Sequence, residues 1–429
     1  MMASHQLDTA EVWIALGDAD HRVGTLYRQR RRSGETVSFR YHEAWLENPP
    51  RFVLEPALPL TTSTYHPPQG QQIFGTIGDS APDTWGRQLM RRRERRQAER
   101  ESRAPRTLGE LDYLLGVADR SRLGALRFRE EGGDVFLAPD QDSVAPFITL
   151  GTLLESVRRI ERNEETDEDL RMMFAPGSSL GGARPKASVI DSDGRMAIAK
   201  FPKETDEYSV ETWEHIALLL AADAGISTPR HELHRVDGRP VLISWRFDRE
   251  GEARVPFLSA LSMLQLTDGQ RASYIEIADE LSRIGSRTRA DLEELYRRMV
   301  FNILISNVDD HLRNHGFLRT GPDGWRLSPV FDLNPTPTDL KARVLTTTIS
   351  LDDGTCSIDL ALEVHRDFRL KEERARAIIA EVAQTVAAWR TVAARVGESE
   401  ASIQRMASAF EHDDLERVQK MTKTYRVGL

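Results

Sequence analysis

The chain has 429 residues, of which 40% are hydrophobic and 29% are charged. That length is enough for about two to three domains, and that composition excludes disorder of the whole chain. The formal net charge of −9 argues against DNA binding through bulk positive charge. The single cysteine, Cys356, excludes a disulfide framework within the chain, so we expect a cytoplasmic protein.

Membrane and targeting signals are not evident in the sequence. No apolar run approaches the roughly 18 residues needed to span a bilayer, so we expect no membrane partner. Residues 1–7 lack the charged-then-apolar order of a signal peptide.

Arginines gather at Arg28–Arg32 and at Arg91–Arg96. The favoured interpretation of the second run is a solvated helix face with local ion pairs, and the alternative is a patch that meets DNA or an acidic partner.

The first third of the chain is predicted to mix strands and helices. Residues 12–27 alternate as a β-hairpin does, with Gly17–Asp20 as the turn, and residues 35–41 are typical of a further strand. A helix is predicted over 79–101, with Asp79 or Ser80 near its start and Pro82 in its first turn. Shorter helices are predicted at 108–115 and 147–163, followed by an acidic joint at 164–169.

A small-residue loop and a lysine-ending strand follow. The loop reads Gly177-Ser-Ser-Leu-Gly-Gly-Ala-Arg-Pro-Lys186. Small residues let backbone N–H groups approach phosphate oxygens, although this is not a Walker A sequence. The apolar run Met196–Lys200 then resembles the kinase strand whose lysine pairs with ATP phosphates. Taken singly, a Gly-Gly pair is usually a turn and a strand-end lysine is usually solvated.

The next segments complete a possible nucleotide site. Residues 210–220 are typical of a helix, which would offer Glu211 and Glu214 as partners for Lys200. Residues 240–249 are typical of a strand that runs into a hinge, and backbone groups of such a hinge bind adenine in kinases. We place a lobe boundary near residues 251–256.

Beyond Leu258 the pattern is mostly helical. Apolar residues recur at helical spacing over 292–305, which places Asp309 just past the C-terminal end of a helix. Residues 345–351 are β-branched and predict a short strand or an analogue of a kinase activation segment. Long amphipathic helices are predicted over 372–396 and over 400–417.

The most informative stretch is Ser306-Asn-Val-Asp-Asp-His-Leu-Arg-Asn314, which follows that helix. Kinase-type phosphoryl transfer needs a carboxylate near the attacking hydroxyl, and an Asn plus a second carboxylate on Mg²⁺. The spacing from Asp309 to Asn314 equals that in H-R-D-x-x-x-x-N, and Asp332 follows a later apolar run. His311 by itself is more often a structural histidine. The order of all these parts along the chain is that of a protein kinase.

Several motifs resemble the HipA family of serine/threonine kinase toxins from bacterial toxin–antitoxin systems. They are Ser178–Ala187, Asn307–Phe317 and Ser328–Pro335, together with Phe74–Gly86 and Leu123–Phe128 near the N-terminus. The resemblance covers nearly the whole chain. It implies an α+β, two-lobed, protein-kinase-like fold with a mixed α/β N-terminal lobe and an all-helical C-terminal lobe. We expect a HipA N-terminal subdomain at 1–135, a kinase N-lobe at 136–255 and a helical lobe at 256–429.

The resemblance also implies a role for each matching residue. Asp309 matches the catalytic Asp that faces the substrate hydroxyl, Asn314 and Asp332 match the Mg²⁺ ligands, and Lys200 matches the lysine on the ATP phosphates. Ser179, or its neighbour Ser178, matches a serine that some members autophosphorylate. Further nucleotide contacts are expected from Lys186, Gly181, Gly182, Ala183, His311 and the hinge around Trp245 to Phe247. Trp245 stands where the family has an acidic hinge residue, which leaves the adenine contacts open.

The sequence therefore predicts an ATP- and Mg²⁺-dependent Ser/Thr protein kinase. The family implies that it acts as a toxin on a translation component such as an aminoacyl-tRNA synthetase. Its expected partners are a HipB-like DNA-binding antitoxin and, mainly through that antitoxin, operator DNA. One alternative is a kinase-fold binding module that represses transcription with the antitoxin. A weaker alternative is a small-molecule phosphotransferase, which would share the catalytic parts.

Overall fold

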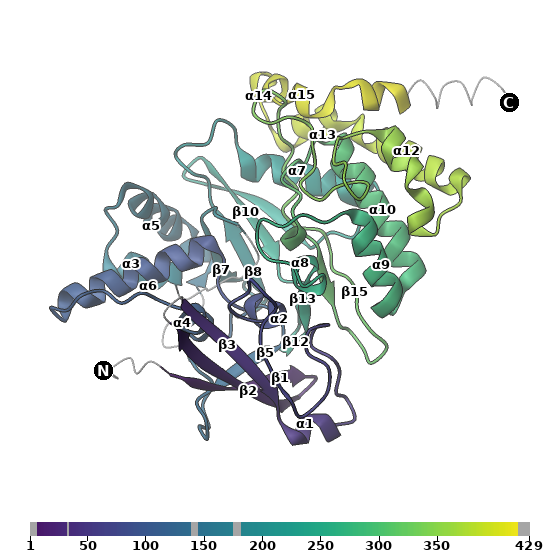
Figure 1. Ribbon diagram of the computed structural model, residues 1–429. Coiled ribbons are helices and arrows are strands. Elements are labelled where there is room, and N and C mark those ends of the chain that lie inside the picture. Colours follow the sequence, from purple (N-terminus) through teal and green to yellow (C-terminus); the bar gives the residue numbers. More distant parts are fainter. Residues whose placement is uncertain (1–6, 32–33, 139–144, 175–181, 419–429) are drawn as a thin grey trace. The chain divides into compact units, whose positions relative to one another are not determined.

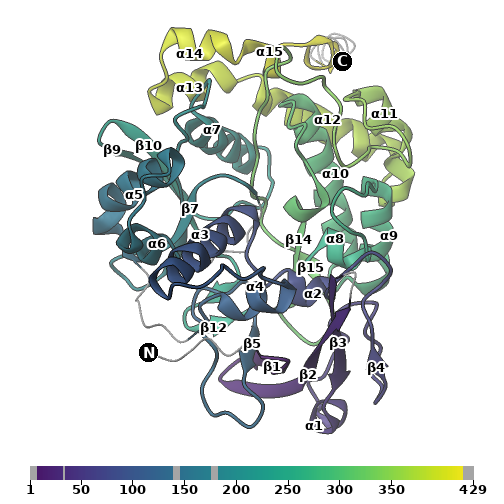
Figure 2. The same cartoon turned by 60° about the vertical axis from the view of Figure 1, so that its left-hand side comes forward.

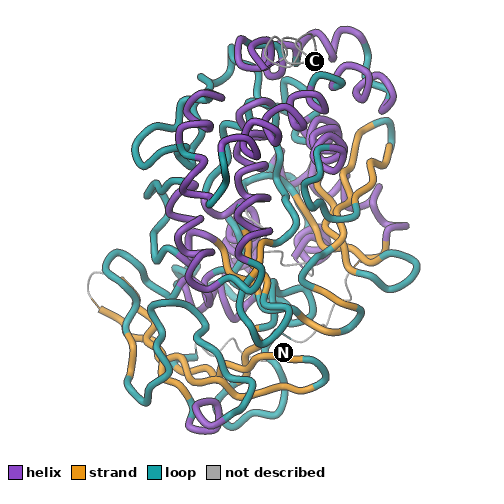
Figure 3. Tube along the Cα trace, turned by 90° about the vertical axis from the view of Figure 1, so that its right-hand side faces the viewer, coloured by secondary structure: helices purple, strands orange, loops and turns teal. Residues whose placement is uncertain are grey.

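The computed structural model describes residues 7–31, 34–138, 145–174 and 182–418 (Figure 1). The chain divides into two compact units, Met1–Thr205 with His231–Asp268, and Asp206–Arg230 with Gly269–Leu429. The first unit is built around two sheets, and the second is mainly helical, as the colours of Figure 3 show. This composition confirms the predicted α+β class. The finer division at residues 135 and 255 stays a prediction.

A five-stranded antiparallel sheet in the order β4-β3-β2-β1-β5 opens the first unit (Figure 2). Its strands are β1 (Thr9–Leu16), β2 (Ala19–Arg31), β3 (Gly34–Tyr41), β4 (Thr64–Tyr65) and β5 (Leu126–Arg129). The predicted hairpin is confirmed, because Leu16 pairs with Ala19 across a tight turn. Gly17 in that turn has φ +58°, which glycine adopts without steric cost.

The helices of the first unit correct two predictions. They are α1 (Glu43–Glu47), α2 (Gly75–Gly78), α3 (Thr84–Arg100), α4 (Glu110–Gly116), η1 (Phe147–Thr149), α5 (Leu150–Arg162), α6 (Asp167–Phe174) and α8 (Ala260–Met263). The helix predicted from Asp79 begins only at Thr84, because the Asp83 side chain caps it by accepting from the Gly86 N–H at 2.8 Å. The acidic joint is instead the start of α6, where Asp169 accepts from the Thr166 N–H and hydroxyl.

A second sheet carries the lysine strand. Its order is β6-β7-β8-β10-β9, and its strands are β6 (Ala145–Pro146), β7 (Lys186–Ile190), β8 (Met196–Lys200), β9 (His231–Val236) and β10 (Arg239–Trp245). Buried apolar residues from α3, α5 and α6 pack against it, among them Trp85, Leu153 and Leu170. The short strands β11 (Arg249–Glu250), β12 (Ala253–Arg254) and β13 (Phe257–Ser259) follow.

The motif Phe74–Gly86 has a structural role in the first unit. The Asp79 carboxylate accepts hydrogen bonds from the Ser259 N–H and hydroxyl, both at 2.8 Å. Gly75 lies so close to Ser262 that a Cβ atom there would stand 2.6 Å from the Ser262 Cβ. The motif therefore packs α2 tightly against α8 and the residues that precede it.

Arginines of both runs form ion pairs, as the favoured interpretation expects of the second run. The buried side chain of Arg28 lies 2.9 Å from Asp112. On α3, Arg92 lies 2.9 Å from Glu165, and Arg96 lies 3.6 Å from Asp167. These arginines are therefore paired with carboxylates of the protein itself.

The second unit contains helices and one short hairpin. Its elements are α7 (Val210–Asp223), α9 (Tyr274–Ile284), α10 (Thr288–Leu304), η2 (Leu312–Asn314), β14 (Gly316–Leu318), β15 (Arg326–Leu327), α11 (Ile358–Glu363), η3 (His365–Phe368), α12 (Glu372–Val386), α13 (Trp389–Val396), α14 (Glu400–Arg405) and α15 (Ala407–Phe410). Since β14 and β15 pair with each other, the expectation of an all-helical C-terminal part holds only in outline.

Three predictions in the second unit need correction. The helix predicted over 372–396 breaks at Ala387 and Ala388, beyond which Trp389 stacks on Phe410 with ring centroids 4.6 Å apart. The helix predicted over 400–417 is also interrupted. Of the two alternatives for residues 345–351, the short strand is wrong, because Thr346 and Thr347 bond to the loop after α10, and the activation-segment analogue stays a prediction.

Candidate active site

The Asp309 carboxylate is exposed on a loop whose backbone is firmly held. As predicted, the loop follows the C-terminal end of α10. The Asp309 carbonyl accepts from the His311 N–H at 2.8 Å and from the Asn314 Nδ2 at 3.2 Å. The Asp309 side chain is 59% exposed, and its Oδ1 lies 3.2 Å from the Lys341 Nζ. An accessible carboxylate on an ordered loop can accept a hydrogen bond from a hydroxyl group.

Asn314 presents a buried oxygen that accepts from no donor among the described residues. Its Nδ2 is engaged by the Asp309 carbonyl, which leaves Oδ1 as the remaining polar atom. Among the described residues, neither Asn314 Oδ1 nor His311 Nδ1 has a hydrogen-bond partner. A buried polar atom without a partner is destabilising. A hard cation such as Mg²⁺, which binds oxygen ligands, would satisfy the Asn314 oxygen.

Asp332 is fixed through its backbone. Its N–H donates to the Glu214 Oε1 at 3.1 Å, and its carbonyl accepts from the Asn334 Nδ2 at 3.2 Å. Its φ of +61° lies in the left-handed region, which Asp tolerates better than most residues. Glu214, which the sequence offered as a partner for Lys200, thus holds the Asp332 backbone, and the proposed contact with Lys200 stays a prediction.

Two loops are joined to each other: the Asp309 loop, residues 305–315 between α10 and β14, and the Asp332 loop, residues 328–336 after β15. The Asn334 N–H donates to the Asn307 Oδ1, and the Thr336 N–H donates to the Ser306 carbonyl, both at 3.2 Å. The two segments that hold Asn314 and Asp332 therefore form one hydrogen-bonded structure, although 18 residues separate those side chains in the sequence.

A buried chain of side chains supports this junction. The Asn307 Nδ2 donates to the Asn302 Oδ1 at 3.1 Å, and the Asn302 Nδ2 donates to the Tyr274 hydroxyl at 2.8 Å. That hydroxyl in turn donates to the Asp310 carboxylate, whose Oδ1 lies 3.1 Å from the His315 Nε2. Burial and the Asp310 charge raise the pKa of Tyr274 well above its usual value, so the hydroxyl stays protonated and can donate. These supporting residues were not predicted, because only folding brings Tyr274 on α9 to Asp310.

The Asn314 oxygen and the Asp332 carboxylate suit Mg²⁺ better than a metal ion whose ligands all come from the protein. In the parts of the chain that the structure describes, no group of three or more His, Cys, Asp or Glu side chains could hold a metal ion. Magnesium usually keeps several waters and takes one or two protein oxygens together with substrate phosphates. One Asn oxygen and one Asp carboxylate on joined loops match that pattern.

In the first unit, Lys200 ends β8 as predicted and lies opposite Lys186 on the adjacent strand β7. Lys186 pairs with Lys200 in the register of β7 and β8. Like charges directly opposite each other are destabilising, but Lys186 lies 2.7 Å from the Asp83 carboxylate, with both side chains 4% exposed. This buried ion pair accounts for Lys186 structurally. Its contact with phosphate stays a prediction.

The residues before β7 are only partly described. Gly182 has φ +101°, which favours glycine over other residues. Gly182 and Ala183 precede Lys186 in an irregular segment, as the prediction of a loop requires. Gly181, Ser178 and Ser179 lie outside the described residues.

The segment after β10 is strongly anchored. The Trp245 Nε1 donates to the Asp191 Oδ2 at 2.8 Å, and the Phe247 ring lies tilted against Phe257 with centroids 6.4 Å apart. Between them, Arg246 forms a fully buried ion pair with Asp248. Burial alone would raise the pKa of Asp248, but the Arg246 and Arg249 charges hold it well below its usual range. Residues 245–248 can therefore present their backbone groups in a fixed position. Their contact with adenine stays a prediction.

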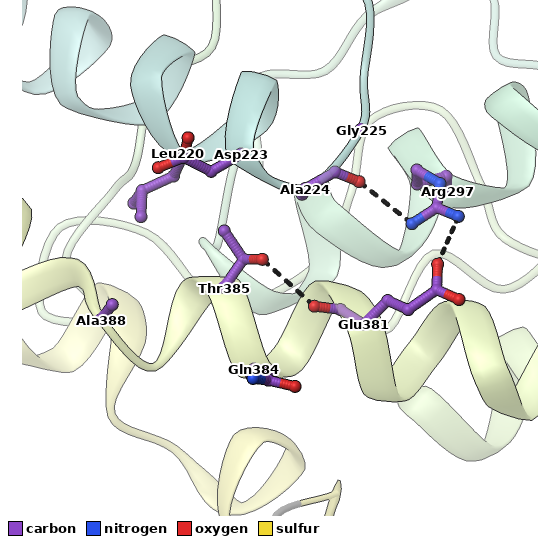
Figure 4. Close-up of a pocket in the computed structure, with 9 residues that line it drawn as sticks. All are labelled: Leu220, Asp223, Ala224, Gly225, Arg297, Glu381, Gln384, Thr385 and Ala388. Atoms are coloured by element: carbon purple, nitrogen blue, oxygen red, sulfur yellow. Dashed lines mark hydrogen bonds and ion pairs between the residues drawn. The ribbon is translucent and has the colours of Figure 1, made fainter.

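A separate pocket of about 550 Å³ lies in the second unit (Figure 4). There the Arg297 guanidinium donates to the Ala224 carbonyl at 3.0 Å and to the Glu381 carboxylate at 2.6 Å. The pocket lining includes no predicted site residue. Its main cation is already paired, so the pocket adds nothing to the candidate active site.

Family models match two long stretches of the chain. Residues 178–389 match the HipA-like C-terminal domain, and residues 12–111 match the HipA N-terminal domain. The chain belongs to the HipA family. One solved structure, the Shewanella oneidensis MR-1 toxin–antitoxin complex of HipA, HipB and operator DNA, contains a chain that is 17% identical with a TM-score of 0.66. That match covers 96% of this chain and 97% of the other, and it shows a shared HipA-like, kinase-like fold.

Two curated relatives match part of the chain. A protein of Sinorhizobium fredii (strain NBRC 101917 / NGR234) named "Putative kinase Y4mE" is 25% identical, and the match covers 36% of this chain and 41% of the relative. A protein of Haemophilus influenzae named "Putative kinase" is 23% identical, over 36% of this chain and 52% of the relative. The chain thus matches about half the length of these relatives or less. No helix among the described residues is long and apolar enough to cross a membrane.

Proposed function

We propose that this chain is an ATP- and Mg²⁺-dependent protein kinase that phosphorylates serine or threonine. The observation that carries this proposal is the junction of the Asp309 loop with the Asp332 loop. It exposes one carboxylate at Asp309 and leaves the Asn314 oxygen without a donor in the parts of the chain that the structure describes. The family membership and the kinase-like fold support the same assignment.

Each site residue then has a distinct task. Asp309 accepts a hydrogen bond from the acceptor hydroxyl and orients it toward the nucleotide. Asn314 Oδ1 and the Asp332 carboxylate would hold Mg²⁺, which when bound neutralises phosphate charge. Lys200 adds a positive charge toward the triphosphate. Positioning and electrostatics of this kind supply most of the catalysis in phosphoryl transfer.

The remaining nucleotide contacts are assigned by family resemblance. The backbone from Trp245 to Phe247 would bind the adenine, and Gly181, Gly182 and Ala183 would approach the phosphates. His311 has a ring nitrogen without a partner among the described residues, and it lies between Asp309 and Asn314. Its contact with nucleotide is assigned by family resemblance.

The biological role proposed is that of a toxin in the cytoplasm. The family supports a HipB-like, DNA-binding antitoxin as partner, with operator DNA reached mainly through that partner. The proposed substrate is a component of translation such as an aminoacyl-tRNA synthetase. A comparison of phosphorylated proteins after expression of the chain and of Asp309→Asn would identify the substrate.

Autophosphorylation in the small-residue loop is a further part of the proposal. A phosphate on Ser179 or Ser178 adds about −1.5 to −2 charge, which would repel the ATP phosphates and lower the affinity for ATP. Mass spectrometry should detect this phosphate in active protein and not in Asp309→Asn. Full activity without any such phosphate, after long incubation with Mg²⁺ and ATP, would exclude autoregulation at this loop.

The kinase assignment is tested with purified protein and ATP labelled at the γ-phosphate. We expect label on protein with the wild type in the presence of Mg²⁺, and none with Asp309→Asn. If the wild type binds its antitoxin but transfers no label, the chain acts as a binding module in transcriptional repression. Label on a small molecule alone would identify a small-molecule phosphotransferase.

A further inference from the structure

An exposed lysine lies beside the proposed catalytic carboxylate. The Lys341 Nζ lies 3.2 Å from the Asp309 Oδ1, and the two side chains are 57% and 59% exposed. Ion pairs this exposed to solvent contribute little to stability. The pair therefore adds little to folding, and its ammonium lies within reach of any group that approaches the Asp309 carboxylate.

The segment that carries Lys341 is fixed to the Asp309 loop on both sides. Before it, the Thr336 N–H donates to the Ser306 carbonyl at 3.2 Å. After it, Arg343 donates to the Ser306 hydroxyl at 3.1 Å and to the Ile303 carbonyl at 3.0 Å. The same guanidinium lies 2.8 Å from Asp414. These contacts set the backbone position of Lys341 relative to α10 and its C-terminal loop.

Two threonines continue this attachment along the loop. The Thr346 hydroxyl donates to the Val308 carbonyl, and the Thr347 N–H donates to the Asp310 carbonyl, both at 2.9 Å. The residues on either side of Asp309 thus accept hydrogen bonds from the segment that follows Lys341. These contacts fix the backbone that carries Lys341 beside the Asp309 loop, and the flexible side chain bridges the remaining distance to Asp309.

The choice of lysine over arginine is itself informative. Only seven of the 58 lysine and arginine residues of the chain are lysines. Lysine carries a compact charge on a flexible stem, whereas the planar guanidinium of arginine suits fixed, paired contacts. Arg343, two residues away, has that anchoring role. Lys341 has the residue type suited to following a charged group as it moves.

We propose that Lys341 is a catalytic residue whose ammonium contacts the phosphoryl group as it passes from ATP to the acceptor. This inference rests on the proposed kinase function. The acceptor oxygen forms a bond to the γ-phosphorus while the bond from that phosphorus to the oxygen that leaves with ADP breaks. The hydroxyl proton passes to the Asp309 carboxylate and then to solvent, and Lys341 remains protonated. Because Lys341 engages Oδ1, Oδ2 can accept the hydroxyl.

The test measures Mg²⁺-dependent ATP hydrolysis, with water as acceptor, so that no protein substrate is needed. Lys341→Met should lower kcat by about 10²- to 10³-fold, the usual effect of removing one group that stabilises transition-state charge. Its affinity for Mg²⁺ and ATP, measured by calorimetry, should remain near that of the wild type. Lys341→Arg should recover part of the rate. Lys371→Met is the matched control, because Lys371 is an exposed lysine of the same unit and should leave the rate unchanged.

The outcomes separate this inference from the function on which it rests. If the wild type hydrolyses ATP and Lys341→Met does so as fast as Lys371→Met, Lys341 is not catalytic and the kinase assignment stands. If Lys341→Met keeps its hydrolysis rate but labels protein poorly, Lys341 recognises the protein substrate and the proposal fails. If the wild type neither hydrolyses ATP nor labels protein, both proposals fail together.

Discussion

Asp332 and Ser306 both have positive φ, at +61° and +52°, and they stand at the two loops that make the candidate site. Non-glycine residues in this region are held there by their surroundings. For Asp332 the surroundings are the Glu214 carboxylate and the Asn334 amide, and for Ser306 they include the Ala409 carbonyl, which accepts from its hydroxyl at 2.8 Å. The backbone strain therefore coincides with the residues that position the proposed chemistry.

Lys200 carries the first prediction at this scale. Expression of the chain without its antitoxin should slow growth, and Lys200→Ala should remove that effect, because the charge toward the triphosphate is lost. Growth is compared at equal protein levels, with Lys203→Ala as the control that keeps the effect. If Lys200→Ala slowed growth as strongly as the wild type, toxicity would not depend on ATP chemistry, and the transcriptional alternative would be favoured.

At the scale of elements, the buried chain from Asp310 through Tyr274 to Asn307 connects α9 to both loops. Tyr274→Phe removes a hydroxyl that makes two hydrogen bonds. It accepts from the Asn302 amide and donates to the Asp310 carboxylate. Leaving such buried groups unpaired should destabilise the protein by about 1–3 kcal/mol. It should also lower the rate of phosphoryl transfer, because Asn307 would hold the Asp332 loop less firmly.

A matched substitution separates the two effects of Tyr274→Phe. Tyr296 is also buried in the second unit, and its hydroxyl donates to the Ala361 carbonyl at 3.0 Å, away from the loops. Tyr296→Phe should lower the melting temperature without changing the transfer rate per folded molecule. Equal transfer rates for both folded variants would show that the Tyr274 chain is structural only.

Local sequence patterns predicted the strands around Lys200 and the helix before Asp309, because apolar periodicity reports the buried face of each element. They missed the late start of α3, since the signal at Asp79 was a contact with Ser259 and not a cap. They also missed the break before Trp389. At the site, motif spacing and the family resemblance pointed to Asp309, Asn314 and Asp332, whose roles stay predictions. The contact of Glu214 with Asp332 and that of Lys341 with Asp309 could not be predicted, because each joins parts of the chain that are distant in sequence.

At the scale of the whole molecule, one buried carboxyl group should make stability depend on pH. Glu55 is fully buried, and burial raises its pKa to about 8, while the Thr76 N–H lowers it and nearby Asp79 raises it. The folded state therefore keeps a proton that the unfolded state releases near pH 4.3. Stability contributed by this group is present below about pH 4.3 and is lost as the pH rises toward 8.

Glu55→Gln should flatten this dependence, because the amide does not ionise. The difference in unfolding free energy between variant and wild type should shift in favour of the variant by up to a few kcal/mol between pH 5 and pH 8. Thermal melting at both values measures the effect, with the exposed Glu130→Gln as control. A wild-type pH dependence that Glu55→Gln leaves unaltered would mean that Glu55 is not the group responsible.

The central claim for the molecule is a division of tasks, with Asp309 serving the acceptor hydroxyl and Asp332 serving the metal and nucleotide. Calorimetric titration of ATP, with and without Mg²⁺, tests it most directly in Asp309→Asn and Asp332→Asn. We predict that Asp309→Asn binds ATP in the presence of Mg²⁺ nearly as the wild type does but transfers no phosphate. Asp332→Asn should lose most of the affinity that Mg²⁺ provides. Equal affinities of the two variants for ATP with Mg²⁺, or near wild-type transfer by Asp309→Asn, would contradict the claim.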